Sequence, residues 1–451
     1  MRYHWLVKRA RSLIASALVI SMVVIAVMAT AQATVTFQEE SLALAPGEIR
    51  TLSAQTPFGV PLRNGLSWSV QPTWLGKMDE RGGFHAGEVS GSGTVTARLG
   101  PASAQVPVTV TCPKLAEIQG IRFEVSCGRT ADVYVDVNAD GGAERARDEV
   151  DRESDRVSRD LQITTDLRFR VYYLGSTQRF TSVVSWLGRG FTSGPTVRDT
   201  EAVYLDLPDF IAIDQSQMAQ LQTANALRHE LVHRSLRQFV GYANIDEIPS
   251  WLNEGWAFLE EAESGRLYTE ARVASASSAF FNRLPSLDSL SDLGDWNSRT
   301  GLDHIYQYYV SLQATQFLID DMTLPGLLRA LKIVGEGEPF KTALTQAVPA
   351  FDFNAFARRF SDRVKALVQE YPGAVAPRGS PDGLGSTVIA YGLRPGVAVT
   401  VTTIGPMERV FSGSADAYGV YVKYLGAEWP VGEYRVTIEA EGRRLQVNVT
   451  R

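Results

Sequence analysis

The sequence His-Glu-Leu-Val-His at residues 229–233 constrains this chain more than any other stretch. It lies late in an apolar run over about 216–240. Ser216 has the chemistry of a helix cap, and Gly241 that of a helix terminator. We therefore expect one long helix that begins at Ser216 and ends at Gly241.

Two histidines of this motif are spaced for metal binding. His229 and His233 are four residues apart, so a helix places their imidazoles on one face, one turn above each other. Glu230 is one step round the helix, within reach of a water held on the same metal. The spacing predicts a metal ion shared by the two imidazoles.

A third ligand is predicted in the segment 249–261 (Pro-Ser-Trp-Leu-Asn-Glu-Gly-Trp-Ala-Phe-Leu-Glu-Glu). Ser250 can cap a second helix, and an antiparallel return would bring Glu254 back to the two histidines. Catalytic zinc sites use three protein ligands and leave the fourth position for water. His229, His233 and Glu254 supply such a set.

Together, the two segments resemble the gluzincin metallopeptidases, and especially their M1 aminopeptidase-like or peptidase MA-like branch. The specific match covers about 227–261, and a weaker one runs to about 343. The resemblance implies one Zn²⁺ per chain, a peptide or protein substrate, and a mixed sheet-and-helix lobe followed by a helical lobe. It also implies that the strand before the motif helix, which we expect at 202–207, is an exposed edge where substrate adds as a further strand.

The chemistry of the motif assigns Glu230 as the general base, which takes a proton from water and passes it to the leaving amine. Zinc ligands need acceptors that orient each imidazole. The resemblance to the aminopeptidase branch places Glu261 in that role, and Asn253 is a further supporting residue. Thermolysin-like enzymes have an acid one turn after the ligand glutamate, where this chain has Phe258.

The oxyanion of a tetrahedral intermediate needs a donor besides the metal. In peptidase MA-like proteins a tyrosine stands ten residues before a leucine, and Tyr308 with Leu318 fits that pattern. Tyr306 is the fallback, and the alternative is that both are core aromatics. His304 lies close by and could bind the oxyanion, but we expect a histidine in a turn.

The resemblance is incomplete. The Gly-x-Met-x-Asn segment with which M1 aminopeptidases hold a free N-terminus is missing, since the comparable residues 188–192 lack the Met and the Asn. Exopeptidase and endopeptidase action both stay open. Two other functions stay open as well: an inactive surface-binding or scaffold protein on a peptidase fold, and a zinc hydrolase of a non-peptide substrate.

Residues 1–33 are typical of a targeting segment. A basic start precedes the apolar run 13–28, and small residues around Ala33 offer a cleavage site. Either the segment is a cleaved signal peptide, or residues 12–28 anchor the chain in a membrane. Both interpretations place the body of the protein outside the cytoplasm, secreted or at the cell surface.

Net charge and cysteine count bear on two further questions, nucleic-acid binding and disulfide formation. The chain has 451 residues with a net charge of −6 and a pI near 5.6, which gives no support for nucleic-acid binding. Its two cysteines are Cys112 and Cys127. An even count in an oxidising compartment favours a disulfide over two buried thiols.

The two ends of the chain predict β-structure. Residues 34–112 alternate in short runs and resemble bacterial Ig-like (Big) domains, which implies contacts with a cell surface or other proteins. Residues 376–451 alternate similarly after a Pro- and Gly-rich linker over 372–385. We therefore predict a multidomain protein: an N-terminal all-β Ig-like sandwich, a central α+β gluzincin metallopeptidase domain at 113–375 with a helical C-terminal lobe, and a small C-terminal β-sandwich. Within the central domain, a charged stretch at about 143–161 predicts a helix with a solvated face and surface ion pairs.

Overall fold

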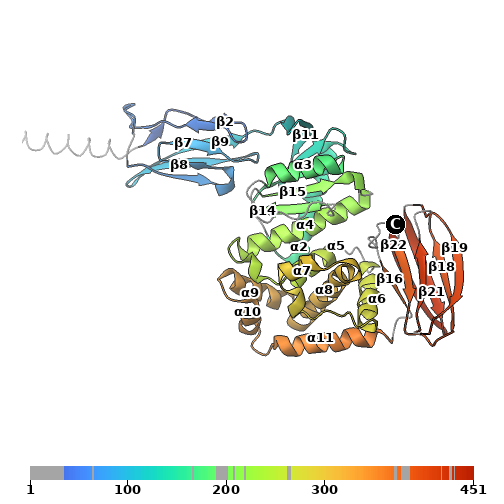
Figure 1. Cartoon of the computed structure of the whole chain (residues 1–451). Coiled ribbons are helices and arrows are strands. Elements are labelled where there is room, and N and C mark those ends of the chain that lie inside the picture. The colour runs from blue at the N-terminus through green and yellow to red at the C-terminus, as the bar shows by residue number, and fades with distance from the viewer. Residues whose placement is uncertain are drawn as a thin grey trace, which may run out of the picture. The chain divides into compact units, whose positions relative to one another are not determined.

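The computed structural model describes the greater part of the chain, and Figure 1 labels many of its helices and strands. The described residues are 35–62, 65–164, 167–188, 202–206, 209–217, 220–261, 266–369, 373–376, 386–417, 419–425, 429–430 and 432–450. They form two compact units, each described here by itself. The first ends at Asp151 and includes Leu167–Trp186, and the second contains Arg152–Asp166 and the chain from Leu187 onward.

The first unit opens with a β-rich region. Its strands form two sheets in the orders β2-β9-β8-β5 and β3-β7-β6, and β1 pairs with β4. Phe84, Val95 and Val106 are fully buried in its core, because alternate residues of β-strands face inward. The strands are β1 (Thr36–Phe37), β2 (Leu42–Leu44), β3 (Ile49–Thr51), β4 (Ala54–Gln55), β5 (Ser67–Gln71), β6 (Gly76–Met78), β7 (Gly83–Ala86), β8 (Gly91–Leu99) and β9 (Ala102–Val110).

The same unit continues into an α+β region. Strands β10, β11 and β12 pair antiparallel in that order, and β12 pairs parallel with β13 through a crossover that contains α2. The elements are β10 (Leu115–Ile118), β11 (Ile121–Cys127), β12 (Ala131–Asp136), β13 (Phe169–Leu174) and α3 (Thr177–Leu187), together with α2 (Ala143–Leu161) as far as Asp151. The charged helix therefore has the limits that its sequence predicts.

Two links join the β-rich region to the α+β region. Cys112 and Cys127 form a disulfide. The carboxylate of Asp132, which is fully buried, accepts hydrogen bonds from the Ser90 hydroxyl at 2.7 Å and from the Arg168 guanidinium at 2.6 Å. A buried carboxylate is tolerated when its oxygens are paired in this way.

The second unit contains a β-hairpin and a helical lobe. Strands β14 and β15 pair antiparallel, with Tyr204 opposite Ile211, and β14 pairs with no other strand in the described part of the chain. The elements are β14 (Ala202–Asp206), β15 (Asp209–Asp214), α4 (Gln220–Val240), α5 (Ser250–Glu261), α6 (Arg266–Phe280), α7 (Leu293–Ser298), α8 (Gly301–Met322), α9 (Leu324–Gly335), α10 (Phe340–Ala347) and α11 (Phe353–Leu367).

Sequence signals set several of these helix ends. The carboxylate of Asp352 caps α11 by accepting the backbone N–H groups of Asn354 and Ala355. Gly241 follows α4 with φ +92°, a conformation that glycine adopts without strain. The predicted start of α4 is wrong: the described helix begins at Gln220. Ser216 instead lies in a short 3₁₀ turn, where its hydroxyl donates to Asp214 at 2.6 Å.

A glycine lets two helices of this lobe pack closely. A Cβ placed on Gly255 of α5 would lie 2.4 Å from the backbone oxygen of Ser311 and 2.5 Å from Oγ1 of Thr315, both on α8. Backbone atoms cannot yield as a flexible side chain can. The close crossing of α5 and α8 therefore requires glycine here.

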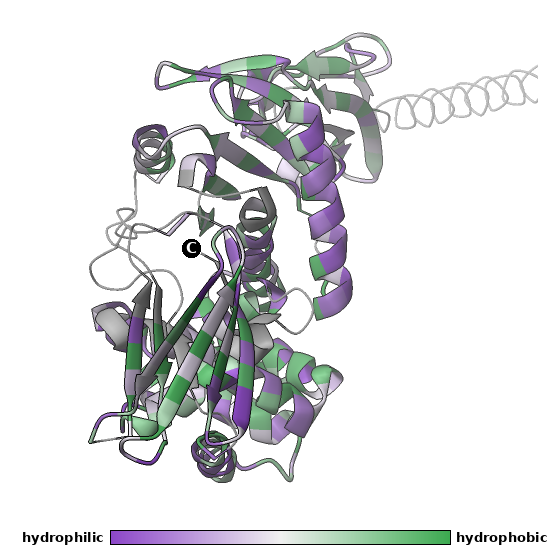
Figure 2. Cartoon of the chain, turned by 90° about the vertical axis from the view of Figure 1, so that its right-hand side faces the viewer, coloured by the Kyte–Doolittle hydropathy of each residue, from purple (hydrophilic) through white to green (hydrophobic). Residues whose placement is uncertain are grey.

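The last part of the second unit is two β-sheets that pack on α6. Their orders are β16-β17-β20 and β19-β18-β21-β22. The Tyr391 hydroxyl donates to the backbone oxygen of Val273 in α6, and Val273 and Ala276 belong to the same apolar core as the sheets. Figure 2 shows hydrophilic and hydrophobic residues alternating along these strands. The strands are β16 (Gly373–Ala376), β17 (Ser386–Ala390), β18 (Ala398–Ile404), β19 (Arg409–Ser414), β20 (Tyr421–Leu425), β21 (Glu433–Ala440) and β22 (Arg443–Thr450).

The predicted order of a β-rich region, an α+β region and a helical region is confirmed. The predicted domain limits stay a prediction; the C-terminal sheets of the structure begin with β16 at Gly373. The segment 1–33 and most of the linker lie outside the described residues. No helix of the described part is long and apolar enough to cross a membrane.

We expect Gly255→Ala to destabilise the protein, because the added methyl group must push α5 away from α8. Overpacking of this kind costs about 1–3 kcal/mol, which a lower melting temperature would reveal. Gly326→Ala is the matched control. Its Cβ would meet Val348 at 3.4 Å, an ordinary contact, so that variant should melt no lower than the wild type. Equal melting temperatures for the two variants would contradict the close-packing interpretation.

Candidate metal centre

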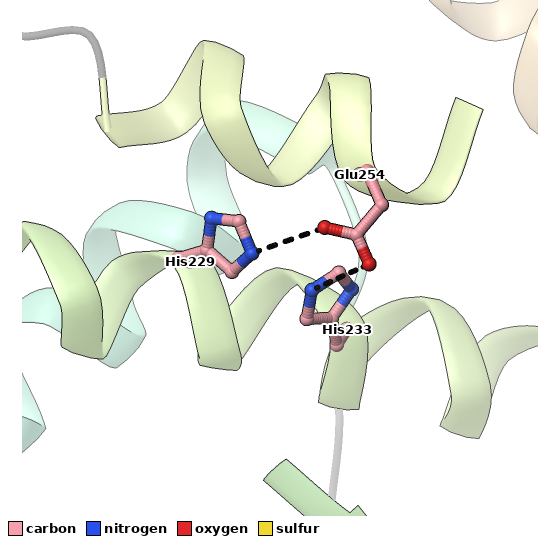
Figure 3. A group of neighbouring side chains, drawn as sticks. All are labelled: His229, His233 and Glu254. Atoms are coloured by element: carbon pink, nitrogen blue, oxygen red, sulfur yellow. Dashed lines mark ion pairs between the residues drawn. The ribbon is translucent and has the colours of Figure 1, made fainter. Parts of the chain in front are cut away.

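Helix α4 presents two imidazoles on one face. His229 and His233 are one turn apart, and their ring centroids are 4.7 Å apart. Helix α5 brings Glu254 to the same point, with one carboxylate oxygen 3.4 Å from Nε2 of His229 and the other 3.7 Å from Nε2 of His233. Figure 3 shows this carboxylate facing both rings. The structure thus brings together the three ligands that the sequence predicts.

The spacing of these atoms suits a small dication. The ligand atoms all lie within 4.8 Å of one another. Zinc bound tetrahedrally at about 2.0–2.1 Å holds its ligand atoms roughly 3.3 Å apart. The observed separations of 3.4 and 3.7 Å are close to that value. Two imidazoles and one carboxylate are also the donor set of a catalytic zinc site.

Each imidazole is oriented by an acceptor on α5. Nδ1–H of His229 donates to Glu261 at 2.5 Å, and Nδ1–H of His233 donates to Asn253 at 3.0 Å. With Nδ1 protonated, the lone pair of a neutral ring lies on Nε2, the nitrogen nearest Glu254. These contacts are those expected of supporting groups in a metal site.

The local charge favours a cation. Burial alone would lower the pKa of His229, but the Glu261 and Glu254 carboxylates outweigh burial, and its pKa lies well above the ordinary value. Burial alone would raise the pKa of Glu254, but the two imidazoles outweigh it, and that pKa lies below its ordinary value. A site that attracts a proton so strongly also attracts a metal ion when both rings are neutral.

Glu230 lies beside the three ligands and is not one of them. Only 7% of its surface is exposed, and burial raises its pKa against the opposing effect of His229 and His233. The backbone of Tyr204, on β14, is also among the groups that lower this pKa. Glu230 thus lies between the metal centre and the edge strand, and α4 packs against β14.

An ion pair ties the hairpin to the motif helix. Arg234 follows His233 directly, and its Nε and Nη2 donate to the carboxylate of Asp209 at the start of β15, at 3.1 and 3.0 Å. The guanidinium is 2% exposed. This fork-shaped contact, which matches carboxylate geometry, fixes β14 and β15 against α4.

Of the two candidate tyrosines, only Tyr308 is close to the carboxylates of the centre. Burial raises its pKa, and Glu254, Glu261 and Glu230 raise it further. The Trp296 and Tyr308 rings meet edge to face, with centroids 5.1 Å apart. Tyr306 instead shares a 2.8 Å hydrogen bond with Ser277 of α6, within a buried cluster.

The expectation for His304 is wrong. It lies in the first turns of α8 and not in a loop turn. Its Nδ1 is 3.0 Å from Nε2 of Gln307, and its ring is edge-on to Tyr308 with centroids 5.3 Å apart. Helix α8 begins at Gly301, three residues before His304.

A buried ion pair that no motif of the sequence indicates lies behind the centre. Arg228, directly before His229, is fully buried, and its Nε lies 3.5 Å from a carboxylate oxygen of Glu153 on α2. Nearby, burial and then Asp160 raise the pKa of Glu260 to about 7. A charge in the inward-facing stripe of α2 is the signal that could have revealed this pair.

Comparisons with known proteins give only distant likenesses. No protein-family model matches the sequence, and no curated protein matches it. An M1 zinc metallopeptidase from Deinococcus radiodurans, solved with a Tyr-Ser-Ala substrate, is 13% identical over 67% of this chain and 61% of its own, with a TM-score of 0.31. An aminopeptidase N family protein from Idiomarina loihiensis is 8% identical over 85% of this chain and 73% of its own, with a TM-score of 0.29.

A short match of another kind also occurs. A carbohydrate acetylesterase from Xanthomonas citri is 27% identical over 15% of each chain, with a TM-score of 0.13. This chain covers 15% of that esterase and 61% of the substrate-bound metallopeptidase, which is less than two thirds of either protein. Overlaps at such TM-scores do not define the site, so its interpretation rests on its own side chains.

Glu261→Gln should weaken zinc binding about 10–100-fold, because a neutral amide holds the His229 ring less strongly than a carboxylate. Competition with a zinc chelator measures the affinity. Glu260→Gln makes the same chemical change one residue away, at a side chain that does not contact either imidazole in the structure. Equal losses of zinc affinity in the two variants would contradict the role of Glu261.

Glu260→Gln should instead change how stability depends on pH. Between its ordinary pKa of 4.5 and its folded pKa of about 7, Glu260 keeps in the folded state a proton that the unfolded chain has lost. The wild type therefore loses stability, on the order of 2 kcal/mol, as the pH rises through this window. The variant does not, so its melting temperature should exceed that of the wild type at pH 8 but not at pH 4. A constant difference at both pH values would refute the linkage.

Proposed function

We propose that this chain is a zinc-dependent peptidase that acts outside the cytoplasm. The observation that carries the proposal is the convergence of His229, His233 and Glu254 beside the buried carboxylate of Glu230. This set contains a dication site and, next to it, a base that is not a ligand. Such an arrangement hydrolyses bonds at neutral pH.

In this proposal His229, His233 and Glu254 hold one zinc ion. When bound, zinc lowers the pKa of water to about 7 and polarises a carbonyl group. The buried position of Glu230 suits a general base, because a raised pKa brings its proton affinity nearer to that of the group it serves. Glu230 takes the proton of the attacking water and passes it to the leaving amine.

Tyr308 is the proposed donor to the oxyanion. Its phenol is half-buried, its ring packs edge to face against the Trp296 ring, and Glu254 is among the groups that raise its pKa. A phenol proton donated to a substrate oxygen in such a desolvated place forms a strong hydrogen bond. Trp296 acts as a positioning residue in this proposal.

Strand β14 is the proposed support for the substrate backbone. It lies at an edge within the described chain, so its outer N–H and C=O groups can pair with an extended peptide. The backbone of Tyr204 on this strand is among the groups that lower the pKa of Glu230, which supports a position of the strand beside the base. The ion pair of Arg234 with Asp209 holds the neighbouring strand β15, which pairs with β14.

The location outside the cytoplasm is supported by the bond between Cys112 and Cys127, since disulfides persist mainly in oxidising compartments. The segment that would hold a free substrate N-terminus, 188–192, lies almost wholly outside the described residues. The proposal therefore includes both exopeptidase and endopeptidase action.

Glu230→Gln is expected to lower peptide hydrolysis by at least about a hundredfold, because an amide of the same size cannot accept a proton. Zinc content and melting temperature should stay near those of the wild type, since Glu230 is not a ligand. Metal analysis and digestion of a peptide library measure the two effects. His233→Ala is the contrasting variant and should lose the metal itself. A wild type that binds zinc and cleaves no peptide would refute the peptidase assignment and favour the scaffold or non-peptide alternatives.

A further inference from the structure

A short hairpin of the β-rich region ends in an exposed apolar tip. After β4 the chain turns back, and Pro61 pairs antiparallel with Gln55. The residues between them include Phe58, which is 80% exposed, and Val60, which is 58% exposed. Large apolar side chains that stand together in water mark a place where another surface binds.

Hydrogen bonds hold this tip in one conformation. The backbone N–H of Thr56 donates to the backbone oxygen of Val60 at 2.9 Å, and the N–H of Gly59 donates to the backbone oxygen of Thr56 at 2.9 Å. The hydroxyl oxygen of Thr56 accepts the N–H of Val60 at 3.3 Å. Gly59 has φ +77°, a conformation that glycine adopts without strain. The turn therefore presents Phe58 to the outside instead of burying it.

The N-terminal segment leaves the β-rich region beside this tip. Strand β1 pairs with β4, with Thr36 opposite Gln55, and Val35 shares a buried apolar cluster with Ala54. Residues 29–34 alone separate Val35 from the apolar run 13–28. The seven steps from 28 to 35 span at most roughly 25 Å of extended chain. A membrane that holds the apolar run is therefore within reach of the tip.

The sequence around this end carries no negative charge. The buried cluster here is built from three segments, 35–38, 54–62 and 97–105. None of them contains Asp or Glu, and the first acidic residue of the whole chain is Glu39. Arg98, in the third segment, is exposed. Although the net charge of the chain is −6, this end suits an anionic surface.

The link to the α+β region lies at the other end of the same strands. Ser90, which donates to Asp132, directly precedes β8, whereas the turn between β8 and β9 follows Leu99. These two strands lie side by side (Figure 1). The nine residues of β8 separate its two ends by roughly 26 Å, at about 3.3 Å per residue. The tip therefore lies at the end of the β-rich region that is remote from the α+β region.

We propose that this end of the β-rich region binds the surface of a lipid bilayer, with Phe58 and Val60 inserted among the headgroups and Arg98 facing anionic lipids. Aromatic and aliphatic side chains of peripheral segments insert at this depth. The membrane is the one that holds the apolar run 13–28, so the inference concerns the chain that retains residues 1–33. It does not depend on the proposed peptidase function.

The test uses the full chain, residues 1–33 included, in vesicles of phosphatidylcholine. Because the native cysteines are joined to each other, Phe58→Cys offers a single thiol for a polarity-sensitive fluorophore. We expect its emission to shift to the blue in vesicles and to be quenched by a quencher attached to the lipid chains. Ile49→Cys is the matched control, since Ile49 is 59% exposed at the start of β3, and its label should stay in water.

Two results would overturn the inference. One is a label at position 58 that the lipid-bound quencher affects no more than the label at position 49. The other is a blue shift that appears without lipid as the protein concentration rises, because the tip would then be a contact between copies of the chain.

The role of Arg98 has a readout of its own. Adding phosphatidylglycerol to the vesicles should increase the quenching at position 58, and salt should reverse that increase because it screens exposed charges. Arg98→Gln should diminish the increase. Arg50→Gln, the same change at an arginine that is paired with Glu48, is the matched control and should leave it unchanged. An equal increase in both variants would overturn the role of Arg98.

Discussion

The site depends on how tightly α5 packs between α4 and α8. Glu254 reaches both imidazoles only because the next residue, Gly255, has no side chain to hold α8 away. The same helix carries Asn253 and Glu261, which orient the two rings by accepting hydrogen bonds from their Nδ1–H groups. One rigid element thus supplies a ligand and both supporting acceptors, so their geometry cannot vary independently.

Buried charge is the second constraint on this arrangement. Arg228 and Arg234 lie on α4 close to the two histidines, and each pairs with a carboxylate from another element, Glu153 or Asp209. Removing one partner of such a pair leaves an uncompensated charge, which costs far more than the pair contributes. These two ion pairs form in only one rotational orientation of α4 about its axis, so they fix that orientation. This orientation is the one that turns both imidazoles toward α5.

Much of this centre could be predicted because the relevant spacing is local. His229 and His233 share a helix face whatever the rest of the chain does, and Glu254 follows in a recognisable segment. The packing of Trp296 against Tyr308 could not be predicted, since no short pattern encodes it. The start of α4 was predicted wrongly because the backbone N–H and the hydroxyl of Ser216 both donate to Asp214, and local contacts of this kind compete with helix formation. Fold order was predictable from periodicity, whereas the limits of the compact units depend on long-range packing.

The C-terminal sheets have a consequence for how the protein is made. Val273 and Ala276 of α6 share one apolar core with the last strands, and β22 ends at Thr450. A chain emerging from the ribosome therefore holds α6 with one face uncovered until these strands have been synthesised. Because α6 also packs against α8, which carries Tyr308, the helical lobe completes its packing only after those strands arrive. The proposed activity would be delayed until then, which would limit premature hydrolysis by a chain still in synthesis.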